Sequence, residues 1–202
     1  MDLNYIKAKE NLLAVQDLSC RQFFLENCYL LEYAYCQLLD DNLELAKEIF
    51  YSLREKDVRA HWAYFMISMI EGNLTEYPTY FELRNFLEID LNILIKYCKG
   101  DYVEKILRYS DFMFSVNPEV YKFIGRVLYN NDMEAQAMYF LETAKNCFYH
   151  DPELHYLIAF IYYNKKDFMK AKKSLQNCLY VLPKYFPAEN LLRKIDVHKY
   201  SS

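Results

Sequence analysis

Apolar residues recur along this chain at helical spacing, and the apolar segments come in pairs. After Pro118, and again after Pro152, an apolar helical segment is followed by a short polar break and a second amphipathic segment. Pro187 follows Pro152 at nearly the interval that separates the first two prolines. Proline is tolerated in the first turn of a helix, and the Asn or Asp before the first two prolines can cap that helix. The pattern predicts two consecutive copies of one helix-pair unit, at residues 118–151 and 152–186.

Small residues occupy the same positions in both copies. Gly125 matches Ala159 in the first helices, and Ala137 matches Ala171 in the second helices. Small side chains allow two antiparallel helices to approach closely, while larger neighbours fill the space above and below. Because one such hairpin cannot bury its apolar face alone, we expect the units to stack. The other matched pairs are Tyr121 with His155, Ile124 with Ile158, Leu128 with Tyr162, Leu141 with Leu175, and Ala144 with Cys178.

The spacing of these residues resembles that of the tetratricopeptide repeat (TPR) family. The TPR pattern has a large residue, Leu-Gly and Tyr in its first helix and Ala-x3-Phe in its second. An earlier copy with this spacing predicts a repeat at 28–58. Its matching residues are Leu30, Tyr33, Ala34, Gln37, Ala46 and Phe50. The resemblance implies an all-α fold, a right-handed α-solenoid of stacked antiparallel helix pairs with roughly 12 helices in one domain over residues 1–202.

Degenerate repeats are expected at 59–117, where the helical pattern lacks a clean repeat. Gly72 ends the first helix there, and Asp90 is expected to cap the third. The predicted helices of this region are 62–70, 78–87, 91–98 and 102–116. The rest of the domain is an N-terminal helical segment at 1–27, with helices expected at 3–15 and 22–39, and a capping helix with a tail at 187–202.

The composition favours an all-helical chain. The 202 residues include three glycines, too few for the tight turns of a β-sandwich or for the glycine cluster of a nucleotide-binding loop. The 21 Tyr and 14 Phe residues are abundant. Because tyrosine combines a large apolar body with a polar tip, it suits a peptide-binding groove as well as a core.

Charge is unevenly distributed along the chain. The formal net charge is −4, but the end from Lys165 onward carries +6, so the segment 1–164 carries −10. A basic end can meet an acidic partner, a membrane surface or nucleic acid, and it can also be the solvated face of a helix.

The sequence predicts a cytoplasmic protein without a transmembrane segment. Its first residues lack the basic and apolar regions of a signal peptide. No stretch without Asp, Glu, Lys or Arg is longer than Ala60 to Ile70, which is too short to cross a bilayer. The six cysteines form no CxxC motif, which is consistent with reduced thiols.

No catalytic or metal-binding motif stands out in the sequence. His150 and His155 flank a helix start instead of sharing one helix face, and His155 fills a position that is aromatic in the preceding copy. Cys20, Cys28 and Cys36 recur at a constant interval that spreads them around a helix. We therefore expect no enzyme activity, no cofactor and no metal site.

The first-helix residues that do not pack within a repeat are expected to line a concave groove. A groove of aromatic residues with two cations suits a partner peptide or helix that has apolar anchors and an acidic group. The Lys-and-Asn arrangement by which some TPR proteins hold a C-terminal carboxylate is not reproduced. The predicted groove residues are Leu31, Tyr35, Lys122, Arg126, Tyr129, Tyr156, Phe160 and Tyr163.

The resemblance implies a non-enzymatic protein–protein interaction scaffold, with an assembly or secretion chaperone as one form of it. Two alternatives stay open. An RNA-binding helical-repeat protein is favoured by the basic end but opposed by the acidic segment 1–164, so nucleic acid is the less favoured partner. A self-associating structural subunit would fill the groove with its own copy, which keeps a homo-oligomer open.

Overall fold

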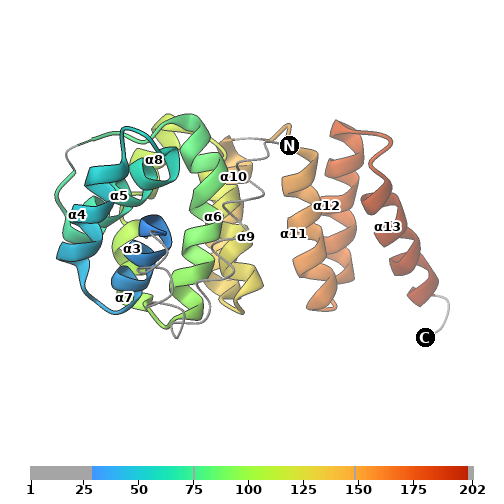
Figure 1. Ribbon diagram of the computed structural model, residues 1–202. Coiled ribbons are helices and arrows are strands. Elements are labelled where there is room, and N and C mark those ends of the chain that lie inside the picture. Colours follow the sequence, from blue (N-terminus) through green and yellow to red (C-terminus); the bar gives the residue numbers. More distant parts are fainter. Residues whose placement is uncertain (1–28, 75, 148, 200–202) are drawn as a thin grey trace. The chain divides into compact units, whose positions relative to one another are not determined.

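The computed structural model describes residues 29–74, 76–147 and 149–199, and every regular element among them is an α-helix (Figure 1). The predicted all-α class is confirmed for these residues. The helix expected at 3–15 and the first part of that at 22–39 lie outside them. The eleven described helices are α3 (Leu30–Leu39), α4 (Leu43–Leu53), α5 (Val58–Glu71), α6 (Tyr80–Lys96), α7 (Gly100–Leu107), α8 (Ser110–Val116), α9 (Val120–Asn130), α10 (Glu134–Cys147), α11 (Pro152–Asn164), α12 (Phe168–Val181) and α13 (Phe186–Lys199).

The chain divides into two compact units, where the sequence predicted one continuous domain. Unit 1 comprises the residues up to Val120, and unit 2 begins at Tyr121. The boundary falls in the first turn of α9, close to the point where the clean repeat pattern begins in the sequence.

Unit 1 is organised around α5, against which α4, α6 and α7 all pack. The α5 side chains from Trp62 to Ile70 are all buried. A helix that is apolar on every side belongs in an interior, and here it supplies much of the core. As predicted, Gly72 ends this helix. It adopts a left-handed conformation (φ 76°) that costs glycine little.

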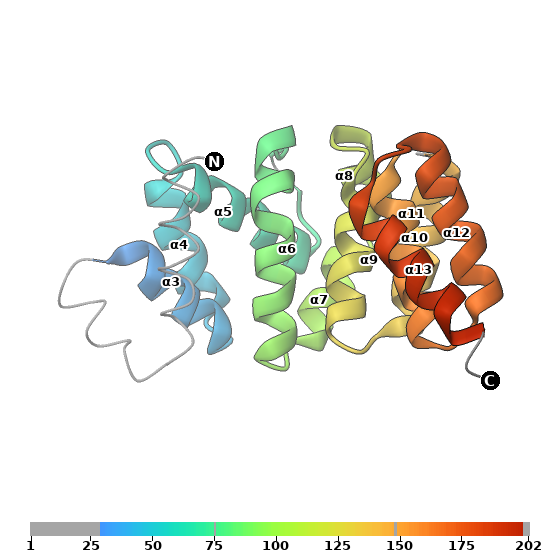
Figure 2. The same ribbon diagram turned by 90° about the vertical axis from the view of Figure 1, so that its right-hand side faces the viewer.

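The helix α6 corrects two of the predicted boundaries. It runs unbroken from Tyr80 to Lys96, so there are not two helices at 78–87 and 91–98 (Figure 2). Its N-cap is Thr79, whose side chain accepts a hydrogen bond from the Glu82 backbone N–H. Asp90 caps nothing, because it lies buried in the middle of the helix.

The helix predicted at 102–116 is instead two short helices, α7 and α8. Arg108 and Tyr109 separate them, so the helical hydrogen-bond pattern is interrupted where a single helix was expected. The turn before α7 lies at Tyr97 and Cys98, Lys99 is the N-cap, and Gly100 is already helical.

In unit 2, consecutive helices α10, α11, α12 and α13 pack on one another in chain order. The core shared by the last three includes the small side chains of Ala159, Ala171 and Ala188, all fully buried. Between α9 and α10, a Cβ atom added to Gly125 would come within 2.6 Å of Leu141 Cγ. The close approach predicted from the small residues at these positions is therefore present.

Five helices of the two units end in the same local structure. A residue in the left-handed conformation follows each of α3, α5, α6, α9 and α11, and the next backbone N–H donates to the carbonyl five positions earlier at 2.8–2.9 Å. This bond satisfies a carbonyl that the helix end leaves open, which offsets the cost of the left-handed conformation at residues other than glycine. The left-handed residues are Asp41, Gly72, Cys98, Asp132 and Lys166.

The last three of these residues recur at one constant interval, which is also the interval between Pro118 and Pro152. The sequence pattern shows this period only from residue 118 onward. The geometry of the helix ends extends it back to the α6–α7 turn, where Asp90 falls at the position that Ile124 and Ile158 fill in unit 2.

Candidate functional site

Four aromatic side chains of unit 2 form a continuous chain of ring contacts, which we call the aromatic face: Tyr129, Tyr156, Phe160 and Tyr185. The ring centroids of Tyr129 and Phe160 lie 6.5 Å apart, those of Tyr156 and Phe160 lie 6.3 Å apart, and those of Tyr156 and Tyr185 lie 5.7 Å apart. Phe160 is 36% exposed, and the tyrosines are half-buried. The face thus joins residues of α9 and α11 with one from the segment before α13.

Helical spacing explains how these rings meet. Tyr156 and Phe160 are one helical turn apart on α11, so their side chains lie on the same side of the helix. Asn164, one turn further on, donates through Nδ2 to the Tyr129 hydroxyl at 2.6 Å. That bond links α11 to α9 and orients the tyrosine ring. The sequence predicted Tyr129, Tyr156 and Phe160 for the groove, but it did not identify Tyr185, which comes from outside the first helices.

The two cations predicted for the groove are engaged by carboxylates within unit 2. Lys122 Nζ lies 2.7 Å from Asp151 Oδ2 and 3.1 Å from Glu153 Oε2, and Arg126 Nη1 lies 2.9 Å from Glu153 Oε1. Lys122 is 5% exposed. Lys122 and Arg126 form these ion pairs because the N-cap and the first turn of α11 carry acidic groups that face α9. These cations therefore hold two helices together.

Leu31 and Tyr35, the other predicted groove residues, belong to unit 1. Leu31 is half-buried, and Tyr35 is only 1% exposed. The Tyr35 ring meets Phe50 edge-on at 5.1 Å, and its hydroxyl donates to Asp90 Oδ2 at 3.2 Å. Tyr35 is thus a core residue of unit 1.

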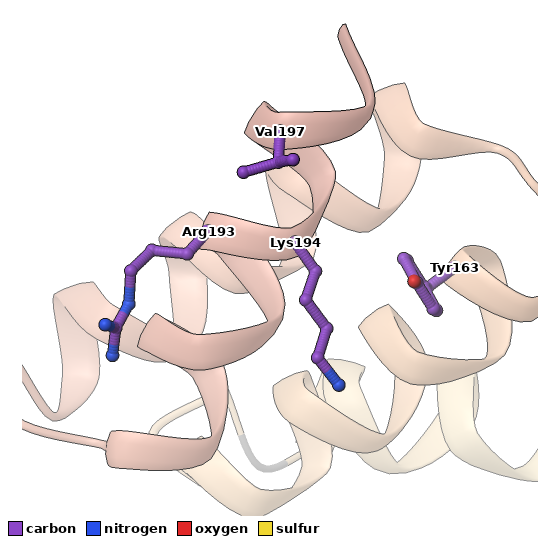
Figure 3. Close-up of a pocket in the computed structure, with 4 residues that line it drawn as sticks. All are labelled: Tyr163, Arg193, Lys194 and Val197. Carbon is purple, nitrogen blue, oxygen red and sulfur yellow. The ribbon is translucent and has the colours of Figure 1, made fainter. Parts of the chain in front are cut away.

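A pocket of about 430 Å³ lies beside the end of α11, with Tyr163 on one side and three residues of α13 on the other. The pocket is lined by Tyr163, Arg193, Lys194 and Val197. Figure 3 shows that the Lys194 side chain extends on the side of α13 that faces Tyr163, whereas Arg193 points away from it. Tyr163, the remaining predicted groove residue, therefore lies at a place where apolar surface and positive charge meet.

A buried polar cluster in unit 1 is the feature that the sequence interpretation missed. Asp90, which is 2% exposed, accepts hydrogen bonds from the Arg59 guanidinium, from Trp62 Nε1 at 2.5 Å and from the Tyr35 hydroxyl. The Arg59 guanidinium carbon also lies 4.6 Å from the centroid of the Phe86 ring. Burial raises the pKa of Asp90, and the charge of Arg59 opposes that shift. The signal in the sequence was a carboxylate at an otherwise apolar position of the helical pattern.

His61 and His155 have structural partners. His61 bridges Glu82 and Glu76, with Nε2 3.2 Å from Glu76 Oε2. His155 is fully buried, and its Nε2 donates to the Tyr149 carbonyl at 2.7 Å. Burial lowers the pKa of His155, which favours the neutral ring. In the described parts of the chain, no group of three or more His, Cys, Asp or Glu residues is arranged to hold a metal ion.

Comparison with known proteins assigns this chain to no family. No family model matches the chain, and a search of curated proteins finds no significant relative.

Among the described residues, no helix has both the length and the apolar character needed to cross a membrane.

Proposed function

We propose that this chain is a helical-repeat protein of the TPR type, an α-solenoid of stacked antiparallel helix pairs. The shared helix ends support this proposal, since three of them recur at the period of that repeat, about 34 residues. The small buried residues between consecutive helices support it as well.

The proposed function is that of a protein-binding scaffold without catalysis of its own, which holds a partner peptide or helix on the aromatic face. The observation that carries this proposal is the chain of ring contacts from Tyr129 through Phe160 and Tyr156 to Tyr185, left partly open to solvent. Rigid aromatic side chains provide large contact areas at a small cost in conformational entropy, and such residues dominate binding energies at interfaces.

The charge arrangement favours apolar anchors on this face. Lys122 and Arg126 are paired with Asp151 and Glu153, so a partner gains little from contacting these cations. The rings are preorganised by contacts with one another and by the bond from Asn164 to Tyr129. Preorganisation lowers the entropy lost on binding.

The test compares two double variants of the full chain. Tyr156→Ala with Phe160→Ala removes the centre of the aromatic face. Tyr139→Ala with Tyr180→Ala removes two rings that are 68% and 77% exposed on α10 and α12, away from the face. We expect a discrete protein from source-cell lysate to bind the parent and the control variant and to be lost with the face variant. The captured protein, once purified, should bind with the same dependence.

Circular dichroism of both variants checks that unit 2 remains folded. Equal capture by the face variant and the parent would contradict the proposal. Retention of bulk RNA that nuclease treatment abolishes would favour the nucleic-acid alternative. A sedimentation coefficient that rises with concentration for the parent but not for the face variant would favour self-association.

A further inference from the structure

We propose that the pocket between Tyr163 and Lys194 selects a partner segment that carries an acidic side chain next to an apolar residue. This inference rests on the proposed function and specifies the chemistry of the partner. It concerns the end of α11 and the exposed side of α13, a site separate from the centre of the aromatic face.

The charges of unit 2 indicate where an acidic group can be held. Lys165, Lys170 and Lys172 each form an ion pair, with Glu134, Asp167 and Asp196 respectively. Lys122 and Arg126 are also paired, so these five cations are already neutralised within the unit.

Among the described residues of unit 2, several cations have no carboxylate partner: Lys166, Lys173, Lys184, Arg193 and Lys194. Of these, Lys194 and Arg193 line the pocket, and only Lys194 extends toward Tyr163. Within the part of the chain that the structure describes, the Lys194 ammonium group has no carboxylate partner, and no acidic residue lines the pocket. Its side chain extends on the side of α13 that faces Tyr163, so both side chains border the same space (Figure 3). An acidic side chain placed there would gain a charge-assisted hydrogen bond from Lys194.

The remaining lining of the pocket suits an apolar neighbour of that acidic residue. The Tyr163 ring is half-buried against Phe168, with centroids 5.8 Å apart, so it presents a fixed apolar surface. Val197 is 65% exposed on the next turn of α13 after Lys194. A volume of about 430 Å³ accommodates a carboxylate together with an aliphatic side chain. The chemistry that fits is therefore an acidic peptide with apolar residues beside the charge.

The number of cations that reach into the pocket favours a peptide over nucleic acid as the partner. A polyanion backbone needs several free cations in a row, because each neutralised phosphate contributes a similar increment of binding. The pocket offers Lys194, with Arg193 directed elsewhere and donating to Asn190. One cation beside an aromatic ring matches a single carboxylate better than a chain of phosphates.

The experiment selects short random-sequence peptides, displayed on phage, against the full chain and three variants. Lys194→Gln removes the charge in the pocket. Lys173→Gln makes the same change on the exposed surface of α12 and serves as the matched control. Tyr156→Ala with Phe160→Ala tests the aromatic face. Selected peptides are resynthesised with Glu or Gln at the acidic position, and their affinities are measured by fluorescence anisotropy at low and high salt.

We expect the parent and Lys173→Gln to enrich peptides in which Asp or Glu adjoins Leu, Ile, Val or Phe. Lys194→Gln should lose that acidic preference and weaken binding of the Glu peptide by about two- to fivefold, with little effect on the Gln peptide. Enriched peptides without an acidic preference would overturn this inference and leave the scaffold proposal standing. If the parent enriches no peptide, both fail. Salt-sensitive binding of a labelled poly-uridine probe that also depends on Lys194 would overturn it in favour of nucleic acid.

Discussion

The two compact units differ in what fills the contacts between their helices. In unit 2, α9, α11 and their neighbours meet through Gly125, Ala159 and Ala171, which allow direct backbone approach. In unit 1, Asp90 lies one interval of 34 residues before Ile124, and side chains from α3 and α5 converge on its carboxylate. The helices of this chain are therefore held together by close apolar packing in unit 2 and by a buried hydrogen-bonded cluster in unit 1.

The two kinds of helix contact, apolar packing and a buried polar cluster, produce different patterns in the sequence. Apolar packing of small residues repeats from copy to copy, because each contact is made between neighbouring helices with the same spacing. A buried carboxylate has to be satisfied by donors from wherever the chain supplies them, here 28, 31 and 55 residues away. The repeat pattern is consequently clear in unit 2 and weak at 59–117.

The largest expected effect comes from removing the acceptor of this cluster. Asp90→Leu leaves the buried Arg59 guanidinium without its counter-charge, and we expect the free energy of unfolding to fall by about 3–5 kcal/mol. Trp62, the one tryptophan of the chain, lies in unit 1 and donates to Asp90. Urea unfolding followed by its fluorescence therefore reports on unit 1, and circular dichroism reports on both units.

Two further variants sharpen this prediction. Arg59→Met combined with Asp90→Leu should recover much of the loss, because replacing both members of a buried ion pair by apolar residues is often close to neutral. Asp101→Asn, an exposed carboxylate of α7, should change stability little. An unchanged midpoint for Asp90→Leu would show that the cluster does not stabilise unit 1.

An intermediate effect is expected from filling the closest helix contact of unit 2. The Cβ of Gly125→Ala would lie 2.6 Å and 2.7 Å from the Leu141 Cγ and Cδ2 atoms, and 3.2 Å from the Ala137 carbonyl oxygen. Overpacking typically costs about 1–3 kcal/mol, which exceeds the gain of about 1 kcal/mol from replacing glycine within a helix. Thermal unfolding followed by circular dichroism should show a lower midpoint.

Gly100→Ala is the matched control for this substitution. Gly100 begins α7, and an added Cβ there has no heavy atom within 4 Å. We expect unchanged or slightly raised stability for this variant. Equal behaviour of the two alanine variants would mean that α9 and α10 are not in such close contact.

The smallest expected effect concerns the pH dependence of unit 2. Burial lowers the pKa of His155 from its ordinary value of 6.5, and the positive charge of Lys145 acts in the same direction. Its Nδ1 atom is buried and has no hydrogen-bond partner in the described structure, so a protonated ring would leave one N–H unsatisfied. The native state thus favours the neutral ring more strongly than the unfolded chain does.

The stability contributed by neutral His155 is complete above pH 6.5. It is lost as the pH falls from 6.5 through the lower pKa of the folded state, because the unfolded chain binds the proton first. Urea midpoints measured by circular dichroism between about pH 8 and pH 5 should show this loss for the parent. His155→Tyr introduces the residue found at position 121, which is aligned with 155 in the sequence pattern, and should lose less stability over this pH range. His150→Gln should behave like the parent. If the urea midpoint depends on pH in the same way for all three proteins, His155 is not the source of that dependence.

Local sequence signals predicted the helices of unit 2 closely. The proline-led start of α11, with Asp151 as its cap, and the polar break before α12 lie where they were expected. The predictions at Asp90 and at Arg108 were wrong. At Asp90, a weak local preference for capping is overridden because the side chain gains buried partners. The break between α7 and α8 has no such explanation at Arg108, whose side chain is 69% exposed.

The sequence by itself determined the all-helical class of the described chain, the end of α5 at Gly72 and the small residues at the helix contacts of unit 2. These features depend on the chemistry of neighbouring residues and on spacing along a single helix or helix pair. Only the tertiary structure decided that Tyr35 is interior, that Asp90 is the centre of a buried cluster, and that Lys122 and Arg126 are engaged by Asp151 and Glu153. Burial and charge pairing join residues that are far apart along the chain, and no periodic pattern specifies such partners.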